Sequence, residues 1–298
     1  MVCRHAIAIG IACMMFAGTG AVRAGPLHDA AKAGDLAQIE ALLAAGADIN
    51  ASTGLATPLL YAIKEKHADA AALLIERGAD VNKQATWGAP LHVAASEGMT
   101  ATATLLLEHS ADPNARWKQL TPLHIAARNG KSDVVRVLLD HGVDINAVTN
   151  LDQPAIHLAR LNNHPDVADL LVARGTKAPP VEPIDALIAS ADAKRGEDRA
   201  LPCKSCHTVD RASKGFAGPP LWNVVGRPKA SVATFKYSPA LMAAGGTWTY
   251  ADLNQYIAQP AWTVPGVAMR MAGIHAPQDR ADIIAFLRTL SDDPAPLP

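Results

Sequence analysis

The sequence predicts an all-α fold in two parts, and three observations support this prediction. A five-residue motif recurs every 32 residues in the first half, as Gly46–Asn50, Gly78–Asn82, Ser110–Asn114 and Gly142–Asn146. Hydrophobic residues make up 49% of the 298 residues, which is enough to bury cores. Nine of the thirteen aromatic residues follow residue 183. We therefore expect a stack of helical repeats first, and then a part with different chemistry.

The charge balance limits the classes of partner. The chain has 27 Lys and Arg against 28 Asp and Glu, so its formal net charge is −1. A strongly basic nucleic-acid binder and a broad polybasic membrane patch are both excluded by this balance. We expect no nucleic-acid partner.

Residues 1–24 have the pattern of a secretory signal peptide. Arg4 gives the positive start, residues 6–17 form an apolar run, and Ala24 ends a plausible cleavage site. The alternative is an uncleaved membrane anchor, but this run is shorter than the ~20 residues that a membrane span needs. We expect an exported, periplasmic protein with no membrane span in its mature form.

Each repeat contains signals for two helices. Thr57-Pro58 and Thr121-Pro122 predict the start of a first helix, because Thr caps free N–H groups and Pro suits the first helical position. Aliphatic pairs such as Leu106-Leu107 keep the same period and predict a second helix that packs on the next repeat. A glycine at its end can adopt the left-handed conformation that stops the helix.

These features over residues 25–177 resemble the ankyrin repeat, with five copies starting near 25, 57, 89, 121 and 154. The resemblance implies an ankyrin-repeat solenoid that binds a protein. Four positions depart from the pattern: Leu60 replaces the histidine of the opening motif, Lys66 and Asn163 replace a mid-repeat glycine, and Pro154 stands where Thr is expected.

Two groups of repeat residues allow two interpretations each. His92, His124 and His157 could bind a metal, but we favour hydrogen bonds that tie adjacent loops. Trp87 and Trp117 lie in consecutive loops, where they are either binding anchors or rings lying flat over their own hairpins.

Residues 178–183 are predicted to be a proline-rich, semi-rigid linker before a second domain at 184–298. This domain contains Cys203-Lys-Ser-Cys206-His207, and the pattern CxxCH is typical of covalent c-type haem attachment. A thioredoxin-like redox pair and half of a zinc site are the alternatives. No βαβ pattern surrounds the motif, and the mature chain has no other cysteine to complete a zinc site. We expect one covalently bound haem c with its iron.

Residues 193–290 resemble a class I cytochrome c of the mitochondrial type, which implies a small helical domain. The matching segments occur in the family's order: Gly218–Arg227, Phe235–Ser238, Gly246–Trp248, Tyr256–Pro260, Val264–Met269 and Arg280–Phe286.

The resemblance implies a role for individual residues around the iron. Cys203 and Cys206 would form the thioethers, and His207 would be the proximal ligand. The carbonyl of Pro219 would accept the second ring N–H of His207, and Met269 would be the distal ligand.

Further positions match residues around the haem periphery. Arg227, Tyr237 and Trp248 match residues that hydrogen-bond a buried propionate, and Tyr256 matches the tyrosine near the Met sulfur. Gly196 matches the small residue where the first and last helices cross.

Several alternatives remain at this stage. Met271 and His275 are rival distal ligands, whereas Met242 is expected to pack in the core. The family's lysine ring is mostly missing, and Trp262 belongs either to an apolar docking patch or to the core.

The predicted function is one-electron transfer by an exported monohaem c-type cytochrome, whose ankyrin stack docks a protein redox partner. A haem-based redox sensor or scaffold that acts through the ankyrin face is the alternative. A peroxidase-type enzyme is disfavoured, because two filled axial positions leave no place for peroxide. We therefore expect an electron-transfer protein rather than an enzyme.

Overall fold

The computed structural model describes residues 25–211 and 217–298. The predicted signal peptide, 1–24, lies outside the described residues. Within the described part, the regular structure is helical, with four isolated β-bridges and no strand. No helix there is both long and apolar enough to cross a membrane.

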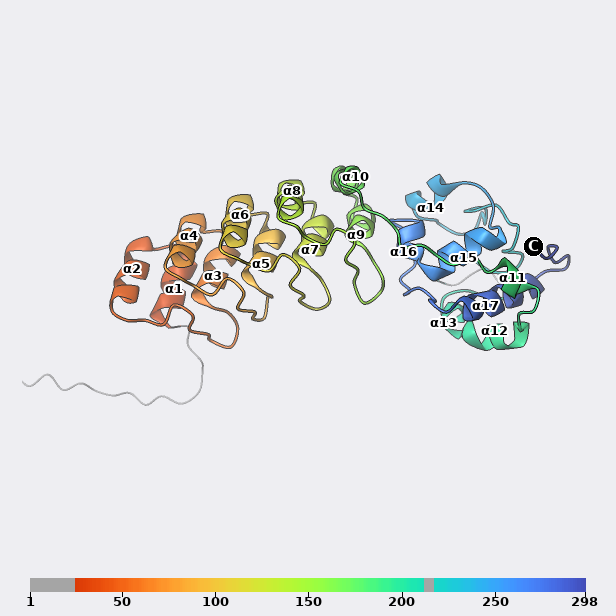
Figure 1. Cartoon of the computed structure of the whole chain (residues 1–298), viewed down its shortest axis with the longest axis horizontal. Helices are drawn as coiled ribbons and strands as arrows, with labels where there is room; N and C mark the ends of the chain where they lie inside the picture. Colours follow the sequence, from red (N-terminus) through yellow and green to blue (C-terminus); the bar gives the residue numbers. More distant parts are fainter. Residues whose placement is uncertain (1–24, 212–216) are drawn as a thin grey trace, which may run out of the picture.

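Ten helices form five antiparallel pairs, which follow one another along the chain as a row (Figure 1). The pairs are α1 (Pro26–Ala33) and α2 (Leu36–Ala44), α3 (Pro58–Lys64) and α4 (Ala68–Glu76), α5 (Pro90–Glu97) and α6 (Thr100–Glu108), α7 (Pro122–Arg128) and α8 (Ser132–Asp140), and α9 (Ala155–Leu161) and α10 (Pro165–Ala173). Their apolar side chains form one continuous core from Leu27 to Leu171. Each pair covers an apolar face of the next, as expected for a solenoid.

The threonine caps are formed where the sequence predicts them. Thr57 Oγ1 accepts a hydrogen bond from the Leu60 N–H at 3.3 Å, and Thr121 Oγ1 accepts one from the His124 N–H. A proline follows each threonine at the first helical position. These side chains satisfy backbone donors that a helix N-terminus leaves free.

Two of the departures from the repeat pattern keep the conformation of the residue they replace. Lys66 and Asn163 have φ values of +66° and +60°, which lie in the left-handed region that favours glycine. The neighbouring repeats have Gly98 and Gly130 there, with φ values of +76° and +65°. The turn between the two helices of a repeat therefore requires this geometry whatever the side chain.

Two buried histidines connect the third repeat to the fourth and the fourth repeat to the fifth. His124 Nδ1 accepts from the Thr121 N–H at 3.3 Å, and its Nε2 donates to the carbonyl of Gln153 at 3.2 Å. His92 makes the same pair of contacts, to the Ala89 N–H and the Ala115 carbonyl. The hydrogen-bonding interpretation therefore describes both side chains.

Burial of His124 predicts an acid-sensitive repeat stack. Burial lowers the pKa of His124 from 6.5 to about 4, so the unfolded chain binds a proton more readily than the folded one. The stabilisation is complete above pH 6.5 and is lost as the pH falls toward 4, by about 3 kcal/mol for this side chain. The free energy of unfolding, measured by urea titration with circular dichroism, should fall less between pH 6.5 and pH 4 in His124→Gln than in the unsubstituted protein. An equal pH dependence in both proteins would contradict this assignment.

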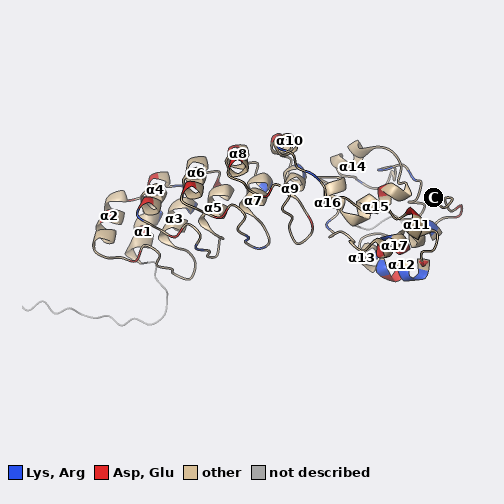
Figure 2. Ribbon diagram, viewed as in Figure 1, with Lys and Arg blue, Asp and Glu red and all other residues tan. Residues whose placement is uncertain are grey.

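The second part contains seven helices in the described residues, around a separate core that begins at Ile184. They are α11 (Asp185–Ile188), α12 (Ala193–Arg199), α13 (Leu201–Lys204), α14 (Pro239–Ala244), α15 (Tyr250–Ala258), α16 (Pro260–Thr263) and α17 (Pro277–Thr289). Basic side chains gather on α12 (Figure 2), which has Lys194, Arg195 and Arg199.

The most extensive helix–helix contact in this part is the crossing of α12 and α17. A Cβ atom at Gly196 would overlap the carbonyl oxygen of Asp282, so the two backbones touch. Phe286 is buried one turn further along α17. Arg195 pairs with the buried Asp282 carboxylate, and this guanidinium helps to hold the pKa of Asp282 below its usual range.

The linker lies against the second part. Gln259 donates from Nε2 to the carbonyl of Pro179 at 3.0 Å, and Asn254 donates from Nδ2 to the carbonyl of Glu182 at 2.9 Å. Asn254 lies in the middle of α15 and Gln259 is its C-cap residue, so hydrogen bonds fix the linker at two points along this helix.

The structure also shows where four large apolar residues of open assignment lie. Met242 is 58% exposed, so the expectation of core packing is wrong. Trp262 is buried, which agrees with the core alternative. Trp87 and Trp117 are half-buried against the first helix of their own repeats: Trp87 lies edge-on to Tyr61 at 5.5 Å between ring centroids, and Trp117 lies 6.4 Å from the ring of His92.

Candidate functional site

The CxxCH motif forms one helical turn. The helix α13 continues past Lys204, because the N–H groups of Cys206 and His207 both donate to the carbonyl of Cys203, at 3.2 and 2.9 Å. Both thiols are free, and Cys206 is the more exposed of the two. Burial raises the pKa of the Cys203 thiol. One turn thus holds two thiols and an imidazole close together.

Hydrogen bonding fixes the orientation of the His207 ring. Its Nδ1 lies 2.7 Å from the carbonyl oxygen of Pro219 and donates to it, because a carbonyl can only accept. This leaves Nε2 as the unprotonated nitrogen, which is the form that binds a metal. Burial lowers the pKa of His207 and so favours the neutral ring.

Gly218 makes room for this ring. A Cβ atom at Gly218 would overlap the imidazole of His207, and the Gly218 N–H donates to the carbonyl of Cys206 at 2.7 Å. The segment before Pro219 therefore lies flat against the ring. Only a glycine fits at this position without moving the histidine.

Arg227 is a half-buried cation with an unused donor. Its Nη1 donates to the carbonyls of Pro220 and Trp222, both at 2.9 Å, but its buried Nε has no partner among the described residues. Burial lowers the pKa of this guanidinium. A buried donor without a partner is costly, and a carboxylate would satisfy both the donor and the charge.

Two aromatic residues predicted beside Arg227 do lie near it. The Trp248 N–H donates to the carbonyl of Arg227 at 2.9 Å, and the Gly226 N–H donates to the carbonyl of Trp248. Tyr237 is buried in the same core, and its hydroxyl accepts from the Val232 N–H at 3.3 Å. Trp248 is therefore bonded to the backbone of Arg227, and Tyr237 packs in the same core as Trp248.

Met269 lies on the loop between α16 and α17, which we call the ligand loop and define as residues 264–276. Met269 is half-buried against the same core as Trp248 and Tyr256, whose rings lie 4.8 Å apart between centroids. Burial raises the pKa of Tyr256, so its phenol stays protonated as a donor. Met271 is not among the described residues that pack on this core.

His275, the other rival ligand, faces the repeats. Its side chain is 74% exposed, and its Nε2 lies 3.2 Å from a carboxylate oxygen of Asp152. This contact directs the ring away from the second core, so the geometry disfavours His275 as a ligand of the iron.

Arg280 is a structural residue of the site that sequence reasoning did not single out. It is buried, donates from Nε to Asn254 Oδ1 at 2.7 Å, and donates from Nη1 to the carbonyl of Ile274 at 3.0 Å. It therefore holds the end of the ligand loop against α15. The only sequence signal is an arginine among the apolar positions of α17.

Together, the fold and the site define a helical repeat protein joined to a c-type haem protein. A family model of ankyrin repeats matches residues 27–116 and 91–179, and a cytochrome c model matches residues 193–291. The chain belongs to the ankyrin repeat family in its N-terminal part and to the cytochrome c family in its C-terminal part.

Curated relatives match the C-terminal part. A "Cytochrome c homolog" from Bradyrhizobium diazoefficiens is 42% identical over 125 residues, which are 42% of this chain and 68% of the relative. A "Cytochrome c homolog" from Rickettsia bellii is 44% identical and covers 37% of this chain and 64% of the relative. A "Cytochrome c2" from Rhodomicrobium vannielii is 44% identical over 34% of this chain and 81% of its own length. The chain thus spans about two thirds of the first two relatives. These relatives and the cytochrome c model support haem electron transfer.

Proposed function

We propose that this protein is an exported monohaem c-type cytochrome that carries single electrons and whose ankyrin stack docks a protein redox partner. The observation that carries the proposal is the His207 ring, which presents Nε2 beside two free thiols while Pro219 holds Nδ1. When bound, haem c supplies a one-electron Fe(III)/Fe(II) couple.

The residues of the C-terminal part fit this group. Cys203 and Cys206 would bind it covalently, and His207 would bind its iron. The carbonyl of Pro219 accepts a hydrogen bond from the Nδ1–H of His207, and this makes Nε2 a more basic ligand. The unpaired Nε of Arg227 is available for a propionate carboxylate, which the adjacent Trp248 can also approach.

Met269 would supply the second axial ligand. A thioether favours the reduced iron and raises the reduction potential, which suits an electron carrier. Tyr256 and the apolar core around Met269 exclude water from that side. If His207 and Met269 both bind the iron, no position would be left for a substrate, which suits an electron carrier rather than an enzyme.

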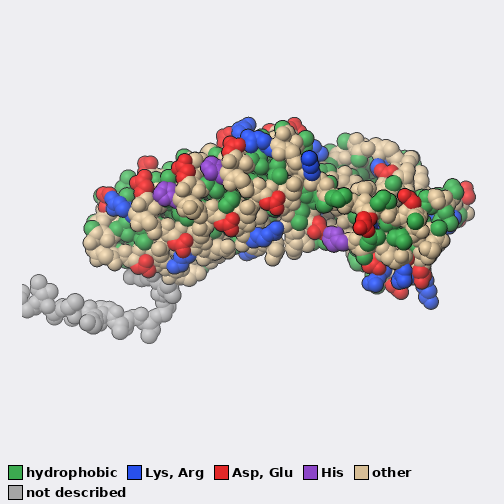
Figure 3. All heavy atoms as spheres, in the orientation of Figure 1, with side chains coloured by type: hydrophobic (Ala, Val, Ile, Leu, Met, Phe, Trp, Pro, Cys, Tyr) green, Lys and Arg blue, Asp and Glu red, His purple; other side chains and the backbone are tan. Residues whose placement is uncertain are grey.

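The repeat part provides a surface for a protein partner. Acidic and basic side chains alternate over the face of the stack seen in Figure 3, without one dominant sign. A partner would therefore be recognised by shape and local charge pairs rather than by long-range attraction. Docking there would keep the partner close to the haem part and raise its effective concentration.

Covalent attachment can be tested through the two thiols. The double variant Cys203→Ala with Cys206→Ala should show no haem stain on a denaturing gel, because it can form no thioether. The matched control is Met242→Ala, which removes an exposed side chain from the same domain and should keep the stain. Haem that stays with the double variant through denaturation would contradict the attachment.

A further inference from the structure

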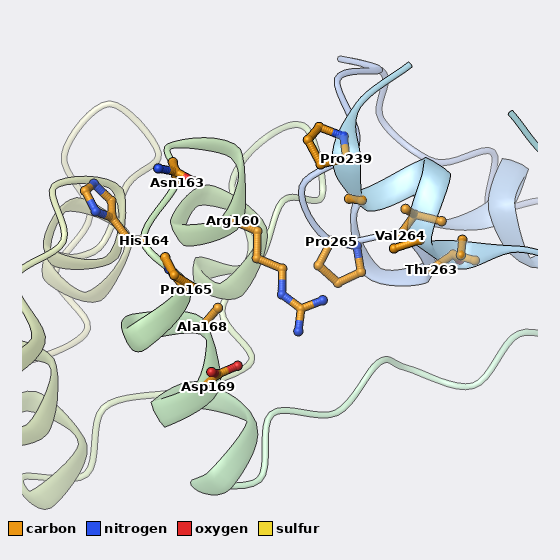
Figure 4. Close-up of a pocket in the computed structure, with 13 residues that line it drawn as sticks. Arg160, Asn163, His164, Pro165, Ala168, Asp169, Pro239, Thr263, Val264 and Pro265 are labelled. Carbon is orange, nitrogen blue, oxygen red and sulfur yellow. The ribbon is translucent and has the colours of Figure 1, made fainter. Parts of the chain in front are cut away.

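The last ankyrin repeat contacts the ligand loop directly. Helix α9 and the loop before it lie beside the C-terminal part, and Figure 4 shows Arg160 of α9 extending into the gap beside Pro265. A cavity of about 530 Å³ follows this boundary between α9, α10, α14 and α16. The two parts therefore meet at the segment that leads to Met269.

The first contact uses His157, the fifth-repeat counterpart of His92 and His124. Its Nδ1 accepts a hydrogen bond from the Gly266 N–H at 3.1 Å, and the histidine is fully buried. Gly266 has a φ of +91°, and a Cβ atom there would lie 2.8 Å from the Cβ of Arg160. The ligand loop thus approaches α9 at a position that only glycine occupies without strain.

The sequence explains why His157 is available for this contact. In the third and fourth repeats, the histidine Nδ1 accepts from the N–H of the residue that caps its own helix, Ala89 or Thr121. In the fifth repeat this residue is Pro154, which has no N–H. The departure from the Thr-Pro pattern leaves the Nδ1 of His157 without its local donor, and the loop supplies one.

The second contact lies on the other side of Met269. Asp152, in the loop before α9, accepts from the Gly273 N–H at 3.0 Å and lies 3.2 Å from Nε2 of His275. Asp152 has a φ of +53°, which lies in the left-handed region that favours glycine. The repeat therefore holds the ligand loop three residues before Met269 and four residues after it.

We propose that the fifth ankyrin repeat is a positioning element for the axial methionine: His157 and Asp152 fix the two ends of the ligand loop and keep the Met269 sulfur on the iron. This inference rests on the proposed function, because it takes Met269 as the distal ligand. It gives the solenoid a role in the redox centre itself, in addition to partner docking.

The test uses the full haem-loaded chain and the double variant Asp152→Gly with His157→Leu. Glycine suits the positive φ of residue 152, so the carboxylate is removed without backbone strain. Hydrogen exchange of the Gly266 and Gly273 amides should become faster. Cyanide should bind the oxidised iron about tenfold faster, the change expected when two hydrogen bonds of ordinary strength no longer hold the loop.

Two further variants keep the test specific. The single variant His157→Asn keeps an acceptor near the position of Nδ1, so it should retain most of the slow cyanide binding of the unsubstituted protein. His92→Leu removes an equally buried histidine whose hydrogen bonds go to Ala89 and Ala115, away from both Asp152 and the ligand loop, so it should leave cyanide binding unchanged. If the double variant unfolds the fifth repeat, Asp152→Gly alone should still give a partial increase.

The outcomes separate this inference from the proposed function. Unchanged amide exchange and unchanged cyanide binding in the double variant would overturn the positioning role. Faster exchange with unchanged cyanide binding would overturn it as well, because the loop would then be held for another purpose. A wild-type protein without a sulfur–iron absorption band would instead reject Met269 as the ligand, while amide exchange would still report whether the repeat holds the loop.

Discussion

Met269→Ala is expected to remove the sulfur–iron absorption band of the oxidised protein, to lower the reduction potential, and to let cyanide bind the iron. A thioether sulfur stabilises Fe(II), so its replacement by water or a harder base favours Fe(III). The vacated position should also give weak peroxidase activity. Absorption spectroscopy and redox titration of the purified holoprotein measure these effects.

Met271→Ala is the matched control, because it shortens the same type of side chain two residues later on the same loop. General damage to the loop would affect both variants, whereas loss of the ligand affects only one. We expect Met271→Ala to keep the band with a small potential shift. If the band survives in Met269→Ala and disappears in Met271→Ala, the ligand is Met271.

The repeat architecture could be predicted because its signals are local. Thr57 and Thr121 cap the helices that follow them, and Gly46, Gly78 and Gly142 adopt the left-handed conformation after the second helix. These features depend on a few neighbouring residues and recur at a fixed spacing. The resemblance of the two parts to ankyrin repeats and cytochrome c could therefore be recognised from the sequence, and the family comparisons confirm it.

Contacts between distant segments could not be predicted in the same way. Arg280 acts through the carbonyl of Ile274 and through Asn254, and no spacing in the sequence links these residues. Met242 is predicted to pack in the core because it lies on a helix, yet the short helix α14 leaves it exposed. A lone apolar side chain is a weak signal for burial.

The meeting of the two parts is the clearest case. Pro154 was visible as a departure from the repeat pattern, but its consequence depends on what lies beside the last repeat. The proline-rich linker suggested a spacer, whereas Gln259 and Asn254 fix it against α15. The direct contacts of His157 and Asp152 with the ligand loop link segments more than 100 residues apart in the chain.

The second large effect is expected at the crossing of α12 and α17. Gly196→Ala should destabilise the haem part by about 2–3 kcal/mol, because the added Cβ overlaps the carbonyl oxygen of Asp282 and must push the two helices apart. Alanine is a better helix former than glycine by about 1 kcal/mol, but this gain is smaller than the cost of separating two backbones. Denaturant unfolding followed by haem absorbance gives the free energy.

Asp198→Ala is the control for this prediction, since it places alanine on the exposed face of the same helix. It should change the free energy of unfolding by no more than about 0.5 kcal/mol. The crossing also lies next to α13, which leads into the CxxCH turn. Separation of the helices in Gly196→Ala should therefore loosen His207. The sulfur–iron band should then weaken before global unfolding. Equal stability of the two variants would show that the backbones of α12 and α17 are not in contact at Gly196.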